Sequence, residues 1–173
     1  MTHPLSFRAL SLALSLLILP LAASASGFTQ PRPGLHTGGQ PKPEQLTELA
    51  NSGVHTVIDL RGANEDRGFD ERAKAKALGM NYISLPINGA DGLTPANASA
   101  LKQALGDGDG VLLHCGSGNR VGALLAMIAV QHEGATKEEA LALGREAGLT
   151  SMEAAVVERL EALPPREAPS PAR

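Results

Sequence analysis

Short runs of apolar and β-branched residues alternate along the chain with segments of helical pattern. Strands are predicted at residues 34–37, 54–60, 81–87 and 111–115. Helices are predicted at residues 43–51, 69–78, 94–105, 121–132, 136–147 and 151–163. This alternation is typical of right-handed βαβ units. We therefore expect a single α/β domain with a central, mostly parallel sheet of four to five strands, helices on both faces, and the last three helices packed together.

A predominantly apolar run near the N-terminus falls outside this pattern. Residues 9–19 follow a short polar start and precede Ala23-Ser24-Ala25. The run is too short to span a bilayer, which takes about 20 apolar residues, and the order is typical of a cleavable signal peptide. We expect a cut after Ala25, a domain over residues 26–163 and a Pro-rich, unfolded tail over 164–173. The protein is then periplasmic or secreted, without stable membrane insertion; an uncleaved membrane anchor is the alternative.

Composition narrows the function classes. The chain has 173 residues, with 15 Lys and Arg against 18 Asp and Glu and a net charge of −3, which argues against nucleic acid as a partner. One cysteine excludes an intrachain disulfide and a cysteine-cluster zinc site. No His and acid pair has the spacing of a metal motif, so we expect neither a metal nor another cofactor.

The segment that indicates chemistry is VLLHCGSGNRVGAL, residues 111–124. The predicted strand delivers Cys115 to the carboxyl edge of the sheet, where open α/β sheets bind ligands. Arg120 follows after four residues, Gly116, Ser117, Gly118 and Asn119, and a long apolar helix begins there. Inward-facing amides of such a loop, the positive end of the helix and a guanidinium fork together form an anion-binding site.

The same arrangement favours a reactive cysteine. A free thiol has a pKa of about 8.5, and a helix N-terminus with a nearby cation lowers it to about 3.5–7.5. We therefore expect the thiolate of Cys115 to reach solvent and to attack a phosphorus or sulfur atom held in the loop. The alternative is that Cys115 is a small buried apolar residue and the glycines only form a turn.

The segment resembles the active-site loop of cysteine-based phosphatases, which have His-Cys, five residues and then Arg. The blocks HTGGQPKPEQL, VHTVIDLRG, MNYISLPI, LLHCGSGNRVGAL and EALALGREAGLTS occur in the order found in the bacterial beta-lactamase-hydrolase-like phosphatase domain family, relatives of the dual-specificity phosphatases. The resemblance implies a cysteine-phosphatase fold and a covalent thiophosphate intermediate. It also implies that Cys115 is the nucleophile, Arg120 binds phosphate, the amides of residues 116–119 bind the anion, and His114 influences the thiolate pKa and the loop conformation.

Two departures from the phosphatase pattern leave other functions open. Four residues separate Cys115 from Arg120, and Val121 stands where phosphatases carry a hydroxyl residue. The shorter spacing is that of rhodaneses, so a sulfurtransferase with a persulfide on Cys115 is the second hypothesis. A non-catalytic anion-binding module is the third. The expected partner is a small phosphate- or sulfur-containing anion or a phosphoprotein.

A phosphatase also needs a proton donor for the leaving oxygen. Asp91 follows the third predicted strand and is the candidate general acid; Asp59 is the reserve candidate, although pairing with Arg61 at the sheet rim is the preferred interpretation. Gly39 and Gln40 are interpreted either as a second wall of the pocket or as a turn. A run of mixed charge is interpreted as a solvated helix entry: Glu65, Asp66, Arg67, Asp70, Glu71 and Arg72.

Overall fold

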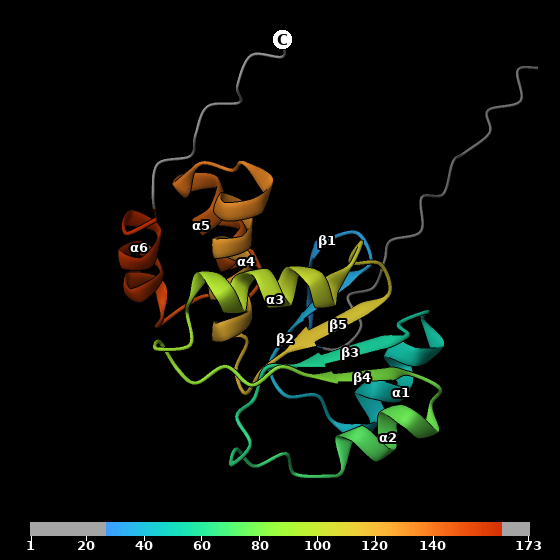
Figure 1. Ribbon diagram of the computed structural model, residues 1–173. Helices are drawn as coiled ribbons and strands as arrows, with labels where there is room; N and C mark the ends of the chain where they lie inside the picture. Colours follow the sequence, from blue (N-terminus) through green and yellow to red (C-terminus); the bar gives the residue numbers. More distant parts are fainter. Residues whose placement is uncertain (1–26, 164–173) are drawn as a thin grey trace, which may run out of the picture.

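The computed structural model describes residues 27–163, which contain one five-stranded sheet (Figure 1). The strand order is β1-β2-β5-β3-β4, with β1 antiparallel to β2 and the other neighbours parallel. The strands are β1 (Thr29–Arg32), β2 (Leu35–Gly38), β3 (Thr56–Asp59), β4 (Asn81–Ser84) and β5 (Val111–His114). The predicted fold class is confirmed, and β1 is an addition to the four strands predicted from the sequence.

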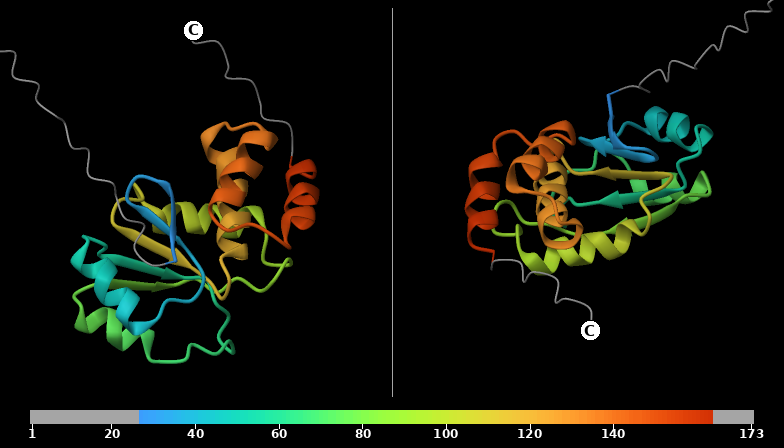
Figure 2. Two further views of the ribbon diagram at one scale, coloured as in Figure 1. Left: turned by 180° about the vertical axis from the view of Figure 1, so that it is seen from behind. Right: turned by 90° about the horizontal axis from the view of Figure 1, so that it is seen from above.

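Helices cover both faces of the sheet (Figures 1 and 2). One face carries α1 (Pro43–Asn51) and α2 (Glu71–Ala77). The opposite face carries α3 (Pro95–Leu105), α4 (Asn119–Glu133), α5 (Lys137–Glu146) and α6 (Glu153–Glu161), with α4 in contact with α5 and α6. No helix in this part of the chain combines the length and apolarity that crossing a bilayer requires. The predicted signal peptide and C-terminal tail lie outside the described residues.

The helix starts follow local capping signals with three differences, in α2, α4 and α6; α4 begins at Asn119, two residues earlier than predicted. The hydroxyls of Thr94 and Thr136 accept backbone N–H groups at the starts of α3 and α5, as predicted. Ser151 does not cap the last helix, which begins at Glu153 after Met152. Helix α2 begins later than predicted, because Asp70 accepts the N–H of Ala73 and so ends the preceding loop.

Strand alternation sends the residues near the end of β5 to different faces. Leu112 packs in the core under α1 and α2, whereas Leu113 packs under the helices of the other face. Because side chains alternate between the two faces of a strand, His114 lies on the same face as Leu112, and Cys115 lies on the same face as Leu113. Cys115 accordingly belongs to the core cluster on the α3–α6 face, and His114 is turned toward α2.

Four fully buried polar side chains lie on the α2 side of this edge: Asp59, Arg61, Glu71 and His114. Arg61 donates from Nε and Nη2 to the two carboxylate oxygens of Asp59, each at 2.9 Å, and from Nη2 to Glu71. Oε1 of Glu71 lies 2.8 Å from Nε2 of His114. We call these four residues the buried polar cluster. Burying the two carboxylates is tolerated because a guanidinium lies between them.

The cluster corrects one sequence interpretation and confirms another. Glu71 was predicted to be solvated, but the first turn of α2 faces the sheet and its carboxylate is buried. The pairing of Asp59 with Arg61 is confirmed. Burial acts to raise the pKa of Asp59, but hydrogen bonds from Arg61 and from the Tyr82 hydroxyl at 2.6 Å outweigh it and hold that pKa well below its ordinary value. Burial and the bond to Asp59 raise the pKa of Tyr82 to about 12.

We predict that Asp59→Asn destabilises the protein by about 3 kcal/mol at pH 7, because it leaves the buried guanidinium with one carboxylate fewer. The folded pKa of Asp59 is depressed, so its contribution is complete above the unfolded pKa and is lost as pH falls through the folded pKa. The difference in unfolding free energy between the wild type and Asp59→Asn should therefore narrow by about 1 kcal/mol as the pH falls from 5 to 3.

Urea unfolding at pH 7, 5 and 3 measures this deficit. Asp107→Asn, at an exposed aspartate, is the matched control and should leave stability unchanged at all three pH values. A deficit for Asp59→Asn that is the same at pH 3 as at pH 7 would contradict the assignment.

Candidate active site

The parallel register brings several strand ends together at one edge of the sheet. Gly38 of β2 and Asp59 of β3 both pair with His114 of β5. The segments that follow these strands therefore surround the six residues from Cys115 to Arg120, which we call the cysteine loop. The backbone N–H of Gln40 donates to the carbonyl of Gly116 at 3.3 Å, so the segment after β2 lies against this loop, as the pocket-wall interpretation of Gly39 and Gln40 requires.

Gly118 sets the shape of the cysteine loop. Its φ of 90° lies in the left-handed region, which residues with a Cβ rarely adopt, and it is the N-cap of α4. From this position its N–H donates to Sγ of Cys115 at 3.1 Å. The turn also starts α4 at Asn119, so that the N-terminus of a 15-residue helix begins beside the sulfur. The predicted meeting of thiol, loop amide and helix N-terminus is thus present.

Asn119 does not direct its side chain to an anion. Its Nδ2 donates to the hydroxyls of Thr150 and Ser151 at 2.9 and 2.7 Å. Its Oδ1 accepts the N–H groups of Thr150 and Met152 at 2.9 and 3.2 Å. The side chain therefore fastens the cysteine loop to the α5–α6 connection, and the anion-binding role predicted for Asn119 is left to its backbone. Gly116 and Ser117 are exposed at the mouth of the loop.

Arg120 is paired with a carboxylate from a distant loop. Its Nη1 and Nη2 donate to Oε1 and Oε2 of Glu65 at 2.5 and 2.6 Å. Nη1 also donates to the carbonyls of Ile87 at 3.0 Å and Leu60 at 3.4 Å. The hydrogen bonds from Arg120 lower the pKa of Glu65, and those to Glu65 raise the pKa of Arg120. The proximity of Cys115 adds to the rise for Arg120.

The thiol of Cys115 does not reach solvent in this structure: its exposed fraction is 0%. The prediction of an exposed thiol is therefore wrong for this conformation. The physical reason is strand alternation: Cys115 lies on the face of the sheet that α3–α6 cover, where it belongs to the core cluster, and its Sγ accepts the N–H of Gly118 at 3.1 Å.

The two candidate acids differ sharply in environment. Asp59 is fully buried and bonded to Arg61 and Tyr82, and its depressed pKa keeps it ionised, so it cannot serve as a proton donor. Asp91 is exposed on the loop between β4 and α3. That loop is anchored at the site through the carbonyl of Ile87, which accepts the bond from Arg120. Asp91 remains the candidate acid.

His114 directly precedes Cys115 and is fully buried. Its Nδ1 is 3.4 Å from the carbonyl oxygen of Cys115 and its Nε2 faces Glu71. Ligand atoms of Asp59, Glu71 and His114 lie within 4.8 Å of one another, the spacing of a cation site. Arg61 donates to both carboxylates of that group, so a guanidinium already provides the positive charge there.

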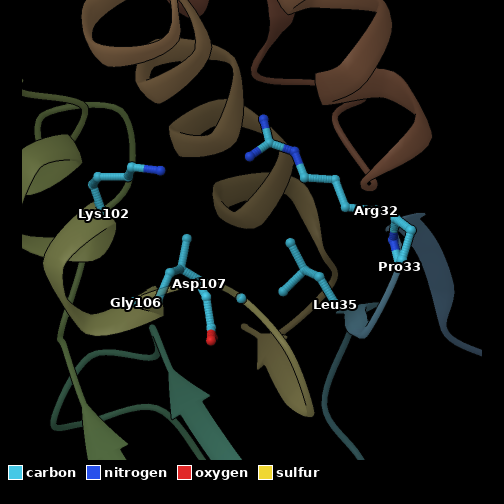
Figure 3. A pocket seen from close by; sticks show the side chains of 8 residues that line it. Arg32, Pro33, Leu35, Lys102, Gly106 and Asp107 are labelled. Carbon is cyan, nitrogen blue, oxygen red and sulfur yellow. The ribbon is translucent and has the colours of Figure 1, made fainter.

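A small pocket of about 30 Å³ lies at the other end of the strands (Figure 3). Leu35, which lines the pocket, pairs with Val111 at the start of β5, whereas Cys115 follows the end of β5. The pocket and Cys115 therefore lie at opposite ends of the strands. Its two cations, Arg32 and Lys102, both bind the carboxylate of Glu133. This pocket is separate from the candidate active site.

Sequence reasoning missed the contribution of the segment at residues 62–68. It interpreted Glu65 and Arg67 as part of a solvated charge run. In the structure Glu65 pairs with Arg120, and Arg67 donates to Asp59 and to backbone carbonyls of its own loop. One available signal was position: Glu65 follows β3 closely, and β3 ends beside β5 at the edge that carries Cys115.

Comparisons with known proteins agree with this geometry. A family model described as "DSP-PTPase phosphatase fused to NAD+ Kinase" matches residues 25–159. The beta-lactamase hydrolase-like protein of Xylella fastidiosa is 33% identical over 119 residues, which are 66% of this chain and 27% of the relative. The chain thus spans about a quarter of the length of the curated relatives it matches.

Solved structures of similar fold include two of TpbA from P. aeruginosa. The free protein is 25% identical with a TM-score of 0.60, covering 77% of this chain and 82% of that one. A cysteine-to-serine variant in complex with phosphotyrosine is 22% identical with a TM-score of 0.60, covering 81% and 92%. Tk-PTP in its active form is 18% identical with a TM-score of 0.59, covering 79% and 98%.

The solved structures establish the fold, and the family match extends over most of the chain, including the whole cysteine loop. The resemblance stated from the sequence is confirmed. The chain belongs to the family described as DSP-PTPase phosphatase fused to NAD+ kinase, a family of cysteine-based, phosphatase-like proteins.

Proposed function

We propose that the protein is an exported, cysteine-dependent hydrolase of phosphoric esters. The observation that carries the proposal is the Gly118 N–H bond to Sγ of Cys115 at the start of α4, with Arg120 in the same six-residue loop. A backbone donor and a helix N-terminus direct partial positive charge at the sulfur, as an attacking cysteine requires. Family membership supports phosphate as the group transferred, and the phosphotyrosine bound by TpbA supports a phosphate-containing substrate.

The reaction proceeds in two displacements. Sγ of Cys115 attacks phosphorus, a P–S bond forms, the P–O ester bond breaks and the leaving oxygen takes a proton. Loop amides and Arg120 hold the charge that develops on the phosphoryl oxygens. Water then attacks phosphorus and gives a proton to the carboxylate that donated the first one, the P–S bond breaks, and inorganic phosphate and the thiolate are released. Asp91 is the proposed donor of the first proton.

The second candidate function is sulfur transfer, which the four-residue spacing between Cys115 and Arg120 favours. In that reaction thiosulfate transfers its outer sulfur to the thiolate and sulfite leaves, forming a persulfide. Cyanide then takes this sulfur, thiocyanate leaves and the thiolate is restored. Both reactions use the same nucleophile, so the assays must compare substrates as well as variants.

We predict that purified protein hydrolyses p-nitrophenyl phosphate faster than it transfers sulfur from thiosulfate to cyanide. Cys115→Ser should abolish hydrolysis, because it removes the nucleophile. Arg120→Lys should lower kcat by about 10²–10³-fold, because a single ammonium cannot replace the guanidinium fork.

Phosphate release that survives Cys115→Ser would refute the assignment of Cys115 as the nucleophile, and sulfur transfer that is faster than hydrolysis would favour the second function. Loss of both reactions with phosphate binding retained would favour the non-catalytic module.

We predict that Asp91→Asn lowers kcat by about 10²-fold for an ester with a poor leaving group, since such an oxygen needs a proton. The loss should be much smaller for p-nitrophenyl phosphate, whose leaving group is stable as an anion. Asp107→Asn, an exposed aspartate at the opposite edge of the sheet, is the matched control and should change neither rate. Equal losses on both esters would remove Asp91 from the acid role.

Export is supported by the apolar run at residues 9–19 and by the start of the family match at residue 25. We predict that the protein made in a Gram-negative bacterium is recovered from the periplasmic fraction with Ser26 as its first residue. Ala25→Leu should block the cut, because signal peptidase requires a small residue there, while Ala22→Leu should not. Mass spectrometry of the fractions measures this, and an uncut chain in the cytoplasm would contradict export.

A further inference from the structure

The sequence block EALALGREAGLTS, residues 139–151, has no role in the proposed function. Its end forms most of the α5–α6 connection, residues 147–152. This connection lies directly against the cysteine loop, because a Cβ added to Gly148 would lie 3.2 Å from the carbonyl oxygen of Gly118. The φ of 110° at Gly148 also favours glycine. The connection therefore packs against the loop backbone to backbone.

The side chain of Asn119 is bonded to this connection through its whole amide group. An asparagine amide can donate two hydrogen bonds and accept two. Nδ2 donates to the hydroxyls of Thr150 and Ser151 at 2.9 and 2.7 Å, and Oδ1 accepts the N–H groups of Thr150 and Met152 at 2.9 and 3.2 Å. Because Asn119 is the first residue of α4, these four bonds fasten the start of the helix to three successive residues of the connection.

A second contact holds the same helix one turn later. A Cβ added to Gly122 would lie 2.3 Å from the carbonyl oxygen of Gly144 and 2.4 Å from the backbone nitrogen of Leu149, so the backbones of α4, α5 and the connection meet there. Arg145 at the end of α5 binds Glu153 at the start of α6, at 2.9 and 2.5 Å. The connection is thus fixed at both ends, and α4 cannot slide along it without breaking the bonds of Asn119.

The backbone donor to the sulfur lies between this contact and β2. The N–H of Gly118, which directly precedes Asn119, donates to Sγ of Cys115 at 3.1 Å. On the β2 side, Gly39 pairs with Ser117. The peptide group between Ser117 and Gly118 is therefore held from β2 through Ser117 and from the α5–α6 connection through Asn119.

We propose that Asn119 is a positioning residue for the reaction at Cys115. By fastening α4 to the α5–α6 connection, it keeps the N–H of Gly118 directed at Sγ and the other loop amides in place for an oxyanion. The inference rests on the proposed function and extends the site to a connection outside the cysteine loop. A neutral amide suits this position because a carboxylate would place a negative charge beside a loop that binds an anion.

The test is hydrogen exchange of the Gly118 amide in the isotope-labelled full chain, measured by NMR. Val111, whose N–H donates to the carbonyl of Gly34 at 3.0 Å at the other end of β5, is the internal reference for overall stability. Thr150→Val combined with Ser151→Ala removes both acceptors of Nδ2 and leaves the cysteine loop unchanged, whereas Asn119→Ala removes all four bonds. We expect exchange of Gly118 relative to Val111 to rise about threefold in the first variant and about tenfold in the second.

Binding of inorganic phosphate, measured by calorimetry, should weaken about threefold and tenfold in the same two variants, because the loop amides lose their fixed orientation. Asn119→Asp is the conservative variant. It keeps the shape, and the two hydroxyls can turn to donate to the carboxylate, so exchange of Gly118 should stay within about twofold of the wild type. Asn51→Ala, at an exposed asparagine that ends α1, is the matched control and should change neither exchange nor phosphate binding.

An unchanged ratio of Gly118 to Val111 exchange in Asn119→Ala would overturn the proposal, because a contact that only stabilises the fold does not single out Gly118. Faster exchange of Gly118 with unchanged phosphate affinity would overturn it as well, since anion binding would then not depend on Asn119. Neither measurement needs turnover, so absence of hydrolysis would refute the proposed function while leaving this test intact.

Discussion

The left-handed turn at Gly118 is the constraint on which the geometry of the site depends. It reverses the chain between β5 and α4 within the cysteine loop, so that one backbone N–H points at the sulfur of Cys115 while a long helix begins beside it. A side chain at this position would be strained in φ and would also lie 3.4 Å from the backbone of Gly38. At 3.4 Å that contact is ordinary, so the strained φ is what restricts this position to glycine.

Around that turn, the structure uses two layers of charge with different exposure. The buried polar cluster lies on the α2 side and fixes the ends of β3 and β5 through Asp59 and His114. The Arg120–Glu65 pair lies at the mouth of the cysteine loop, where the carboxylate remains partly in solvent. Arg67 connects the two layers, because it binds Asp59 and also braces the loop that carries Glu65. The inner layer is fully buried, whereas the outer pair is partly exposed.

Sequence reasoning succeeded where the signals are local. Capping by Thr94 and Thr136, the alternation of strands with helices, and the order of Cys115, the glycines and Arg120 all depend on residues close together in the chain. Strand β1 was missed because Pro31 interrupts it and its pairing with β2 is irregular. The partners of Glu65 and Glu71 were missed for a different reason. Glu65 and Arg120 are 55 positions apart, and the sequence of a charged segment does not show whether tertiary packing buries it.

The most direct test of the account is to identify the group that carries phosphate during turnover. Protein mixed rapidly with a phosphoric ester, quenched and digested should yield the peptide containing Cys115 with the added mass of one phosphoryl group. The adduct should be absent from Cys115→Ser and should decay as inorganic phosphate is released. A phosphoryl group on any other side chain, or steady hydrolysis with no adduct on Cys115, would contradict a covalent mechanism at this loop.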